Sequence, residues 1–325
     1  FWASKVLLSA IKLGLFTFLG NRAYPAESIR HALGLHPRSL YDFLDALTAL
    51  GLLQRDGLLA EAQYRNTEQT AFFLDRTKPS YIGGILEMCN DRLYPFWGTL
   101  EEGLKTGAPQ NEAKHSDENL FEALYADPQR LEQFLEAMIG IQSGAFQAFA
   151  QKFNFTPYKT LCDIGGATGI LSILVAKNNP HLNCTTFDLP AVERVAKKWV
   201  EKFNLTNRIQ IKNGDFFKDP LPHADIITMG NILHDWGYED KLKLARAAYD
   251  ALPEDGAFVV IESIIDDNRN QNVFGLMMSL NMLIETREGY DFTFQDFKDL
   301  CQKAGFRDFE LMHLTGPTSA AIAYK

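Results

Sequence analysis

The chain has 325 residues, more than one compact core usually serves, so two domains are expected. With 46% hydrophobic and 22% charged residues, its composition is that of an ordinary globular protein. The formal net charge of -9 argues against a protein that works mainly on nucleic acid. The 4 cysteines stand far apart without a CxxC pair, which argues against a structural zinc site and favours a reduced, cytoplasmic chain.

Residues 6–19 form the one stretch that resembles a membrane segment. This stretch is shorter than the roughly 20 apolar residues that a spanning helix needs, and Lys12 lies in its middle. No small-residue cleavage pattern of a signal peptide follows it. We therefore expect a buried amphipathic helix and no contact with a membrane.

Residues 1–105 are predicted to form short helices followed by a hairpin, the pattern of a winged helix. Winged helices often bind DNA, but residues 1–100 hold ten Lys and Arg against nine Asp and Glu. The helix that would enter a DNA groove also carries Asp42 and Asp45. We therefore expect a scaffold or dimerisation domain and no nucleic-acid partner.

The second half of the chain has a different pattern. Residues 106–155 are expected to hold a linker and connecting helices, and from 156 to 325 short apolar runs alternate with helical segments. This alternation predicts a parallel sheet with helices on both faces. The last two apolar runs, FRDFELMHL and SAAIAYK, are joined only by TGPT and must pair antiparallel. The predicted fold class is α/β: a Rossmann-like sheet with a C-terminal antiparallel hairpin, preceded by the mainly helical domain.

In an open α/β sheet, ligands bind at the carboxyl ends of the strands, near the switch in strand order. The candidate cofactor-binding residues at these ends are Asp163, Gly165, Gly166, Gly169, Asp188, Leu189, Gly214, Asp215, Phe216 and Asn231. The glycine run does not match the dinucleotide pattern GxGxxG, because Ala167 and Ile170 stand at its second and third glycine positions.

The acidic candidates indicate which ligand the sheet would hold. Asp163, at the mouth of the glycine turn, is unsuited to a pyrophosphate and suits an ammonium group. Asp188 can accept two ribose hydroxyls, and Asp215 beside Phe216 offers an acceptor and an aromatic face for adenine. Together they predict a nucleoside with a cationic amino-acid tail, which describes S-adenosylmethionine.

A catalytic base is predicted on the loop after the fourth strand. His234 lies there, and Glu262 ends the next strand, so a carboxylate is expected to orient the imidazole and support its protonated form. A phenol has a pKa of about 10, so a neutral imidazole that takes its proton during attack would assist methyl transfer to oxygen. Asp235, which follows His234, is expected to line the acceptor pocket.

The segments DIGGATG, FDLP, NGDFF, NILHDW, ALPEDGAFVVIES and TGPTSAAIAYK are specific as a set. Together they resemble class I S-adenosylmethionine-dependent O-methyltransferases of the caffeic acid and acetylserotonin (hydroxyindole) type, in the bacterial branch. The likeness covers nearly the whole chain. In that family the N-terminal part is a dimerisation domain that contributes to the partner's pocket, so the resemblance implies a homodimer.

The resemblance also implies roles for individual positions. The residues that match the family's cofactor contacts are Gly165, Asp188, Asp215 and Phe216. His234 matches the catalytic base, and Glu262 matches one of two acids that flank it. The second acid falls at Asp291, where plant members have glutamate. Met282 falls where the family places a methionine against the acceptor ring, although simple core packing explains a methionine there equally well.

The sequence departs from the family pattern at three places. Ala167 stands where many members have a third glycine, which a turn with ordinary φ would tolerate. Gly230 stands where plant members carry a lysine that helps to hold the cofactor. Residues 106–119 match no substrate-specific subgroup, so the acceptor is left open among phenols, hydroxyindoles, quinols and enols.

The sequence therefore predicts an S-adenosylmethionine-dependent O-methyltransferase that acts on a small-molecule hydroxyl, releases S-adenosylhomocysteine and needs no metal. One alternative is a family member that binds S-adenosylmethionine without methylating oxygen, against which His234 and Glu262 argue. A second is a DNA-binding regulator that uses the winged helix, which the acidic balance disfavours. A NAD-dependent oxidoreductase is disfavoured by the failed GxGxxG match.

Overall fold

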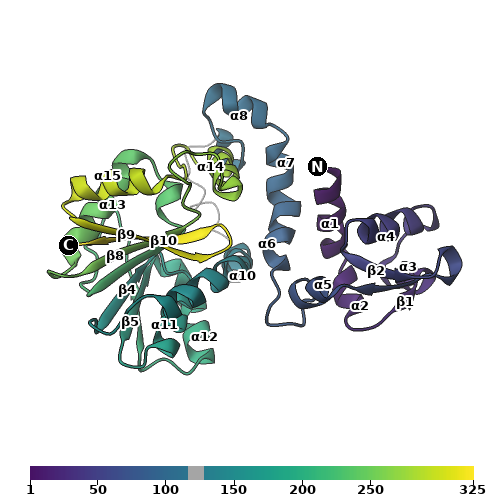
Figure 1. Ribbon diagram of the computed structural model, residues 1–325, viewed down its shortest axis with the longest axis horizontal. Coiled ribbons are helices and arrows are strands. Elements are labelled where there is room, and N and C mark those ends of the chain that lie inside the picture. The colour runs from purple at the N-terminus through teal and green to yellow at the C-terminus, as the bar shows by residue number, and fades with distance from the viewer. Residues whose placement is uncertain (116–127) are drawn as a thin grey trace. The chain divides into compact units, whose positions relative to one another are not determined.

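The computed structural model describes residues 1–115 and 128–325, and it separates into two compact units (Figure 1). One unit comprises Phe1–Gly98 with Glu136–Ile141, and the other comprises Thr99–Leu135 with Gln142–Lys325. The expected domain boundaries at residues 105 and 155 stay predictions. In the described part of the chain, no helix is long and apolar enough to cross a membrane.

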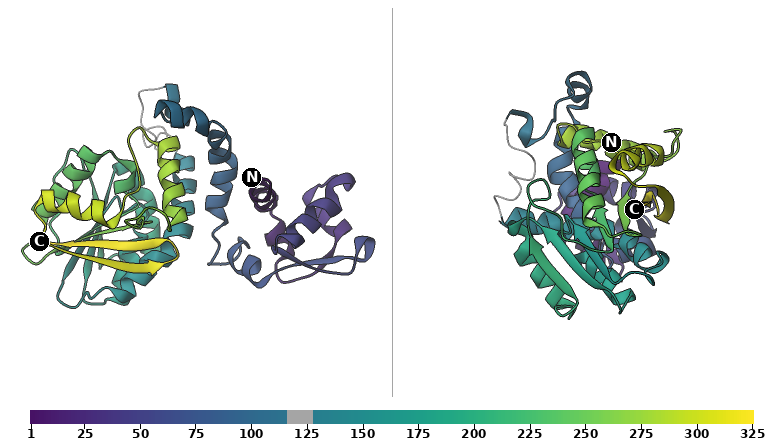
Figure 2. Two further views of the ribbon diagram at one scale, coloured as in Figure 1. Left: turned by 45° about the horizontal axis from the view of Figure 1, so that its top comes forward. Right: turned by 90° about the vertical axis from the view of Figure 1, so that its left-hand side faces the viewer.

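The first unit is mainly helical and holds a small antiparallel sheet in the order β1-β3-β2 (Figure 2). Its elements are α1 (Trp2–Lys12), α2 (Leu15–Leu19), β1 (Tyr24–Pro25), α3 (Ala26–Leu33), α4 (Leu40–Ala49), β2 (Leu53–Asp56), β3 (Gln63–Asn66), α5 (Glu68–Phe73), α6 (Gly83–Met88) and α7 (Tyr94–Trp97). The apolar stretch at residues 6–19 forms two helices where one was expected, because Gly14 adopts a left-handed φ of 75° between them.

In the core of the first unit, α1, α2, α3 and α4 pack together with the β2–β3 hairpin. Leu44 and Leu47 of α4 are fully buried, as is Tyr64 of β3. Tyr64 Oη donates to Asp45 Oδ1 at 2.8 Å, and Arg55 Nη1 donates to the same oxygen at 2.6 Å. The acidic side chain on α4 is thus bound by its own hairpin. The helices and the hairpin follow in the predicted order, and the winged-helix interpretation stays a prediction.

The second unit is built around a seven-stranded sheet with the strand order β6-β5-β4-β7-β8-β10-β9. Its elements are α8 (Leu100–Thr106), α10 (Pro128–Lys152), β4 (Thr160–Ile164), α11 (Ile170–Asn178), β5 (Asn183–Asp188), α12 (Glu193–Lys202), β6 (Ile209–Asn213), β7 (Ile226–Gly230), α13 (Tyr238–Ala251), β8 (Ala257–Glu262), α14 (Val273–Glu285), α15 (Phe294–Ala304), β9 (Asp308–Thr315) and β10 (Thr318–Tyr324).

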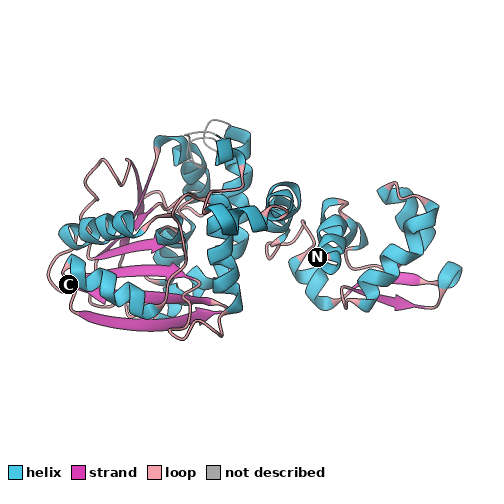
Figure 3. Cartoon of the chain, turned by 90° about the horizontal axis from the view of Figure 1, so that it is seen from above, coloured by secondary structure: helices cyan, strands magenta, loops and turns pink. Residues whose placement is uncertain are grey.

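The sheet confirms the predicted topology. The strands from β6 to β8 are parallel, and β10 is antiparallel to both β8 and β9. The strand order reverses between β4 and its neighbours β5 and β7, which places a switch point at the end of β4. Figure 3 shows the strands side by side with helices on both faces of the sheet.

Helices α13 and α15 cover one face of this sheet, and α11 lies against β4 and β5 on the other. On the first face, Phe258 and Val260 of β8 meet Ala245 of α13 and Phe297 of α15, and all four are completely buried. Alternate residues of each strand point to opposite faces. The packing of both faces leaves the carboxyl ends of the strands as the edge at which polar side chains gather.

The absence of a side chain at Gly230 has a structural cause in the second unit. A Cβ atom at Gly230 would lie 2.7 Å from the ring of Phe146, which extends from α10 and is only 4% exposed. The aromatic ring therefore occupies the space that a side chain at position 230 would need. A side chain at position 230 requires this ring to move.

We expect Gly230→Ala to lower the free energy of unfolding by about 1–3 kcal/mol, because the added methyl overpacks a buried site. Urea unfolding of Gly230→Ala, Phe146→Leu and the double variant measures this effect, and the double variant should lose less than the sum of the two. Gly144→Ala is the control, because its methyl would meet nothing closer than 3.8 Å in the same helix as Phe146. If the loss of unfolding free energy in the double variant equals the sum of the two single losses, the steric explanation is contradicted.

Candidate active site

The turn after β4 is shaped by residues in the left-handed region of backbone conformation. Gly165 has a φ of 66° and Gly169 a φ of 73°. A Cβ atom at Gly166 would lie 2.2 Å from Thr186 Oγ1, so only glycine fits there. The turn therefore exposes backbone that a ligand can approach closely.

Ala167 corrects one expectation about this turn. An ordinary φ was predicted for it, but its φ is 51°, a conformation that costs a residue with a side chain about 1 kcal/mol. Two interactions hold it there: its N–H donates to Asp188 Oδ2 at 2.8 Å, and it packs against an apolar cluster. That cluster consists of Leu131, Leu135, Val192 and Val195.

Asp188 lies at the end of β5, beside the glycine turn. Its Oδ2 accepts the N–H of Ala167, and its Oδ1 accepts the N–H of Leu189 at 2.7 Å. Burial raises the pKa of Asp188 to about 6, and the two backbone donors oppose the shift. Each oxygen retains a further lone pair for a hydroxyl donor such as a ribose.

Three buried hydroxyl groups surround the same turn without a hydrogen-bond partner among the described residues. They belong to Thr168, Ser172 and Thr186. A buried hydroxyl without a partner is unfavourable, so a polar ligand at this turn would stabilise the site. Together with the exposed backbone and Asp188, these hydroxyls fit a nucleoside ligand with several polar groups.

Asp163 lies within β4 and is only 3% exposed. Its Oδ1 accepts a hydrogen bond from Thr228 Oγ1 of β7 at 2.8 Å. Burial raises the pKa of Asp163 to about 7, against the opposing effect of Thr228. Its carboxyl group is thus enclosed by the sheet, next to Gly166, instead of lying open at the mouth of the turn. Its contact with a cofactor stays a prediction.

Residues after β6 and β7 bring aromatic rings to the same edge. Phe216 and Phe217 both make edge-to-face contacts with Trp236, with ring centroids 6.0 and 4.6 Å apart. Asp215 accepts the N–H of Phe217 at 2.9 Å, which fixes this turn. From the sequence, only Phe216 was expected to face the cofactor; Phe217 and Trp236 follow the same strands, but no role was predicted for them.

The remaining cofactor candidates, Gly214 and Asn231, have distinctive backbone environments. Gly214 packs against the ring of Phe187, where a Cβ atom would lie 2.3 Å away. Asn231 has a φ of 54°, and its N–H donates to Ile261 O at 3.1 Å. A strained residue directly after β7 is typical of a functional loop, but the ligand contacts of both residues stay predictions.

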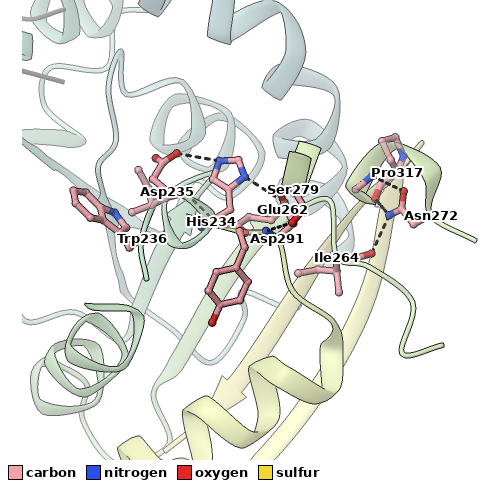
Figure 4. A network of polar contacts seen from close by, with 12 residues as sticks. His234, Asp235, Trp236, Glu262, Ile264, Asn272, Ser279, Asp291 and Pro317 are labelled. Carbon is pink, nitrogen blue, oxygen red and sulfur yellow. Dashed lines mark hydrogen bonds and ion pairs between the residues drawn. The ribbon is translucent and has the colours of Figure 1, made fainter. Parts of the chain in front are cut away.

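His234 is buried between two carboxylates (Figure 4). Its Nδ1 lies 3.2 Å from Asp291 Oδ1, and its Nε2 lies 3.6 Å from Asp235 Oδ1. Glu262, at the end of β8, accepts the backbone N–H of His234 and that of Ile232 on its Oε1, each at 3.2 Å. The structure thus brings together the predicted base and both predicted flanking acids.

The carboxylates determine the charge of the imidazole. Burial alone would lower the pKa of His234, but the negative charges of Glu262, Asp235 and Asp291 raise it to about 10. Burial raises the pKa of Glu262 to about 7 and that of Asp235 to about 6, although His234 opposes both shifts. The cluster therefore favours the protonated imidazole, the form that a general base reaches after it accepts a proton.

His234, Glu262 and Asp291 bring nitrogen and oxygen atoms within 4.8 Å of one another. A metal ion could use such a spacing, but here Nδ1 of His234 already contacts Asp291, and Glu262 accepts two backbone N–H groups. These direct interactions fit proton transfer. The expectation that the enzyme needs no metal stays a prediction.

Two residues that support this cluster were not predicted. Ser279 of α14 accepts the backbone N–H of Asp291 at 3.2 Å, and Lys241 of α13 donates to Trp236 O at 2.5 Å and to Tyr290 O at 3.0 Å. A signal for Lys241 was present, because it stands on the apolar face of its helix with Leu244 and Ala245. Met282 is buried in α14, and its place against an acceptor ring stays a prediction.

Comparison with known proteins identifies the family. Residues 97–307 match the model of the O-methyltransferase domain, and residues 1–76 match that of the O-methyltransferase dimerisation domain. The chain belongs to the O-methyltransferase family. This confirms the predicted enzyme class, an S-adenosylmethionine-dependent O-methyltransferase with a Rossmann-like sheet and an N-terminal dimerisation domain.

Three relatives of this O-methyltransferase cover nearly its whole length. The tetracenomycin polyketide synthesis 8-O-methyl transferase of Streptomyces glaucescens is 37% identical over 100% of the chain and 94% of the relative. The 3-hydroxy-5-methyl-1-naphthoate 3-O-methyltransferase of Streptomyces sahachiroi is 32% identical over 99% and 91%. The structure of human N-acetylserotonin methyltransferase in complex with S-adenosylmethionine superimposes with a TM-score of 0.91, at 29% identity, over 99% of this chain and 93% of that one.

We expect Asp188→Asn to weaken S-adenosylmethionine binding at least about tenfold, because one carboxylate acceptor is lost. Asp225→Asn is the control: Asp225 also accepts two backbone N–H groups, from Lys159 and Thr160, but at the opposite end of β4. Isothermal titration calorimetry of both variants gives the affinities. Equal affinities for the two variants would show that the ribose does not lie at Asp188.

Proposed function

We propose that this O-methyltransferase methylates a phenolic hydroxyl of a fused-ring aromatic molecule, with His234 as the general base. The observation that carries the proposal is the buried His234 imidazole, which lies between Asp235 and Asp291 at the edge that also holds the glycine turn. Proton removal and cofactor binding thus take place at one edge of one sheet.

S-adenosylmethionine would be held by the turn after β4, by Asp188 and by the segment that contains Asp215 and Phe216. When bound, it supplies an activated methyl group on a positively charged sulfur. Asp188 would accept the ribose hydroxyls, and the aromatic face of Phe216 would contact the adenine. The three unpartnered hydroxyl groups at the turn support this placement, because they need polar partners.

His234 would take the acceptor's proton on Nε2 while Nδ1 remains on Asp291. The imidazolium that forms lies in the field of Glu262, Asp235 and Asp291, which lowers the free energy of the proton-transfer product. Asp291 also fixes the orientation of the ring, since its own backbone N–H is bonded to Ser279. General-base assistance of this kind is typically worth about 10²–10⁴ in rate.

The acceptor class is supported by the relatives. The names of the two Streptomyces enzymes specify an 8-O-methyl transfer in polyketide synthesis and a 3-O-methyl transfer on a hydroxynaphthoate. A naphthoate contains two fused aromatic rings, and the match covers more than nine-tenths of the length of each relative. A naphthol or a larger fused phenol is therefore the first acceptor to test.

We also infer that the enzyme acts as a homodimer in the cytoplasm, without a metal ion and without a nucleic-acid partner. The match of residues 1–76 to a dimerisation domain supports the dimer. The net charge of -9 supports the absence of a nucleic-acid partner. Light scattering of the purified protein tests whether it is a dimer. An activity assay with and without a chelator tests whether it works without a metal ion.

We expect release of S-adenosylhomocysteine when the enzyme receives S-adenosylmethionine and a hydroxylated naphthoate or anthraquinone, and much less release with a monocyclic catechol. Mass spectrometry of a panel of phenols, hydroxyindoles, quinols, enols and arylamines measures it. His234→Ala should lower kcat by roughly 10²-fold or more and leave the affinity for S-adenosylmethionine nearly unchanged. Near-normal turnover by this variant would remove His234 from the mechanism, and turnover of only the arylamines would replace oxygen by nitrogen as the acceptor.

We expect kcat/KM to rise with pH around a midpoint at least about one unit above 6.5, the ordinary pKa of histidine. The sign follows from the raised pKa of His234: the ring stays protonated, and cannot accept a proton, until the pH approaches about 10. The measurement uses two acceptors whose hydroxyl pKa values differ. If the midpoint differs between the two acceptors, it reports the pKa of the acceptor hydroxyl and not that of His234. A midpoint at or below 6.5 that is common to both acceptors would contradict the proposed electrostatics.

A further inference from the structure

Lys241 is a buried lysine that no role assigned so far explains. It lies in the first turn of α13 and is only 2% exposed. Its ammonium donates to Trp236 O at 2.5 Å and to Tyr290 O at 3.0 Å, and it lies 3.4 Å from the centroid of the Tyr290 ring. The enclosed cation is thus bound by two backbone carbonyls and an aromatic face.

The two carbonyls belong to the two loops of the proton-transfer cluster. Trp236 stands two residues after His234, and Tyr290 directly precedes Asp291. These loops come from distant parts of the chain, and His234 Nδ1 meets Asp291 Oδ1 between them at 3.2 Å. One ammonium group therefore joins the loop of the base to the loop of its orienting acid.

Burial of an ammonium group is unfavourable by several kcal/mol unless other groups compensate for the lost water. Burial lowers the pKa of Lys241 to about 8, and four acids from four elements oppose this shift: Glu262 of β8, Asp235 of the His234 loop, Asp291 and, on α15, Asp296. None of the ion pairs in the described part of the chain includes Lys241, so its charge acts on the cluster as a whole. A methionine of similar length would fill the same space without the charge or the donors.

We propose that Lys241 is a positioning residue for the methyl-transfer reaction, which joins the loops of His234 and Asp291 and balances the negative charge of the acids around the base. The proposal rests on His234 as the general base. With Lys241 in place, the base and its orienting acid keep their hydrogen bond, and the excess of carboxylates over cations at the cluster is reduced. Without Lys241, the two loops lose the ammonium group that binds both of them, and the pKa values of His234 and of the surrounding acids rise.

The direction of the pH effect follows from the charges. Lys241 lowers the pKa of Glu262 and the pKa of Asp235, each of which burial raises first. Removal of this cation therefore raises the proton affinity of the acids and of the imidazole among them. The acid limb of the pH–rate profile should move to higher pH over the range below about pH 8, in which Lys241 carries its charge. A lysine that only filled space would affect the melting temperature and leave this limb in place.

The test compares Lys241→Met and Lys241→Arg with wild type and with Lys243→Met. Lys243 is the matched control, because it lies on the same helix, is 68% exposed and pairs only with Asp240 in the described structure. Each variant is assayed for kcat and KM from pH 6 to 10, for S-adenosylmethionine affinity by calorimetry, and for melting temperature. If K241M does not yield folded protein, K241Q takes its place with the same readouts.

We expect K241M to lower kcat at least about tenfold, to move the acid limb upward by roughly half a unit or more, and to leave S-adenosylmethionine affinity within about twofold. K241R should keep the limb near its wild-type position, since it keeps the charge and the donors. K243M should match wild type.

Two results would overturn the proposal. One is a lower melting temperature for K241M with kcat and the acid limb unchanged, which would make Lys241 a packing residue. The other is an equal shift of the limb in K241M and K241R, which would show that the charge has no role. His234→Ala, assayed beside these variants, separates the two proposals: an active His234→Ala enzyme refutes the general base, whereas an inactive one with an unaltered K241M refutes only the role of Lys241.

Discussion

The site depends on one electrostatic arrangement: the imidazole of His234 is buried beside three carboxyl groups, whose negative charge exceeds the single positive charge of a protonated imidazole. Such an arrangement is costly to bury, and the structure compensates for it with backbone donors and a buried cation. Glu262 accepts the N–H groups of Ile232 and His234, so this acid orients the main chain of the base loop. Asp291 acts on the ring itself. The two flanking acids therefore have different tasks, one for the backbone and one for the side chain.

The sheet explains how these groups meet. Glu262 ends β8, and His234 lies on the loop after the adjacent parallel strand β7, so both reach the same edge. Asp291 belongs to no strand of the sheet. It reaches the edge because Ile265, just beyond β8, forms an isolated parallel bridge with Thr293 and donates its N–H to Phe292 O at 3.0 Å. The loop before α15 thus runs along the extension of β8, which places the second acid beside the first.

The strand order, the C-terminal hairpin and the residues at the strand ends could be predicted from the sequence, because alternation of strands and helices leaves few topologies open. The local contacts around the acids could not be predicted from the sequence. An ordinary φ was predicted for Ala167, but a hydrogen bond to Asp188 and an apolar cluster hold it in the left-handed region. Likewise, Lys241 binds the backbone carbonyl of Tyr290, and Ser279 binds the backbone N–H of Asp291. The spacing of residues along the chain does not predict such contacts.

Ile232 connects the glycine turn to the loop that carries His234. Its side chain lies so close to Gly165 that a Cβ atom there would fall 2.4 Å from Ile232 Cδ1, and its N–H is bonded to Glu262 Oε1. Trp236, on the same loop, contacts Phe216 and Phe217 of the loop after β6. A ligand that presses on the glycine turn or on these rings therefore acts on the segment that carries His234. Because packed side chains transmit small displacements, a ligand at the glycine turn and the geometry of the His234 loop would constrain each other.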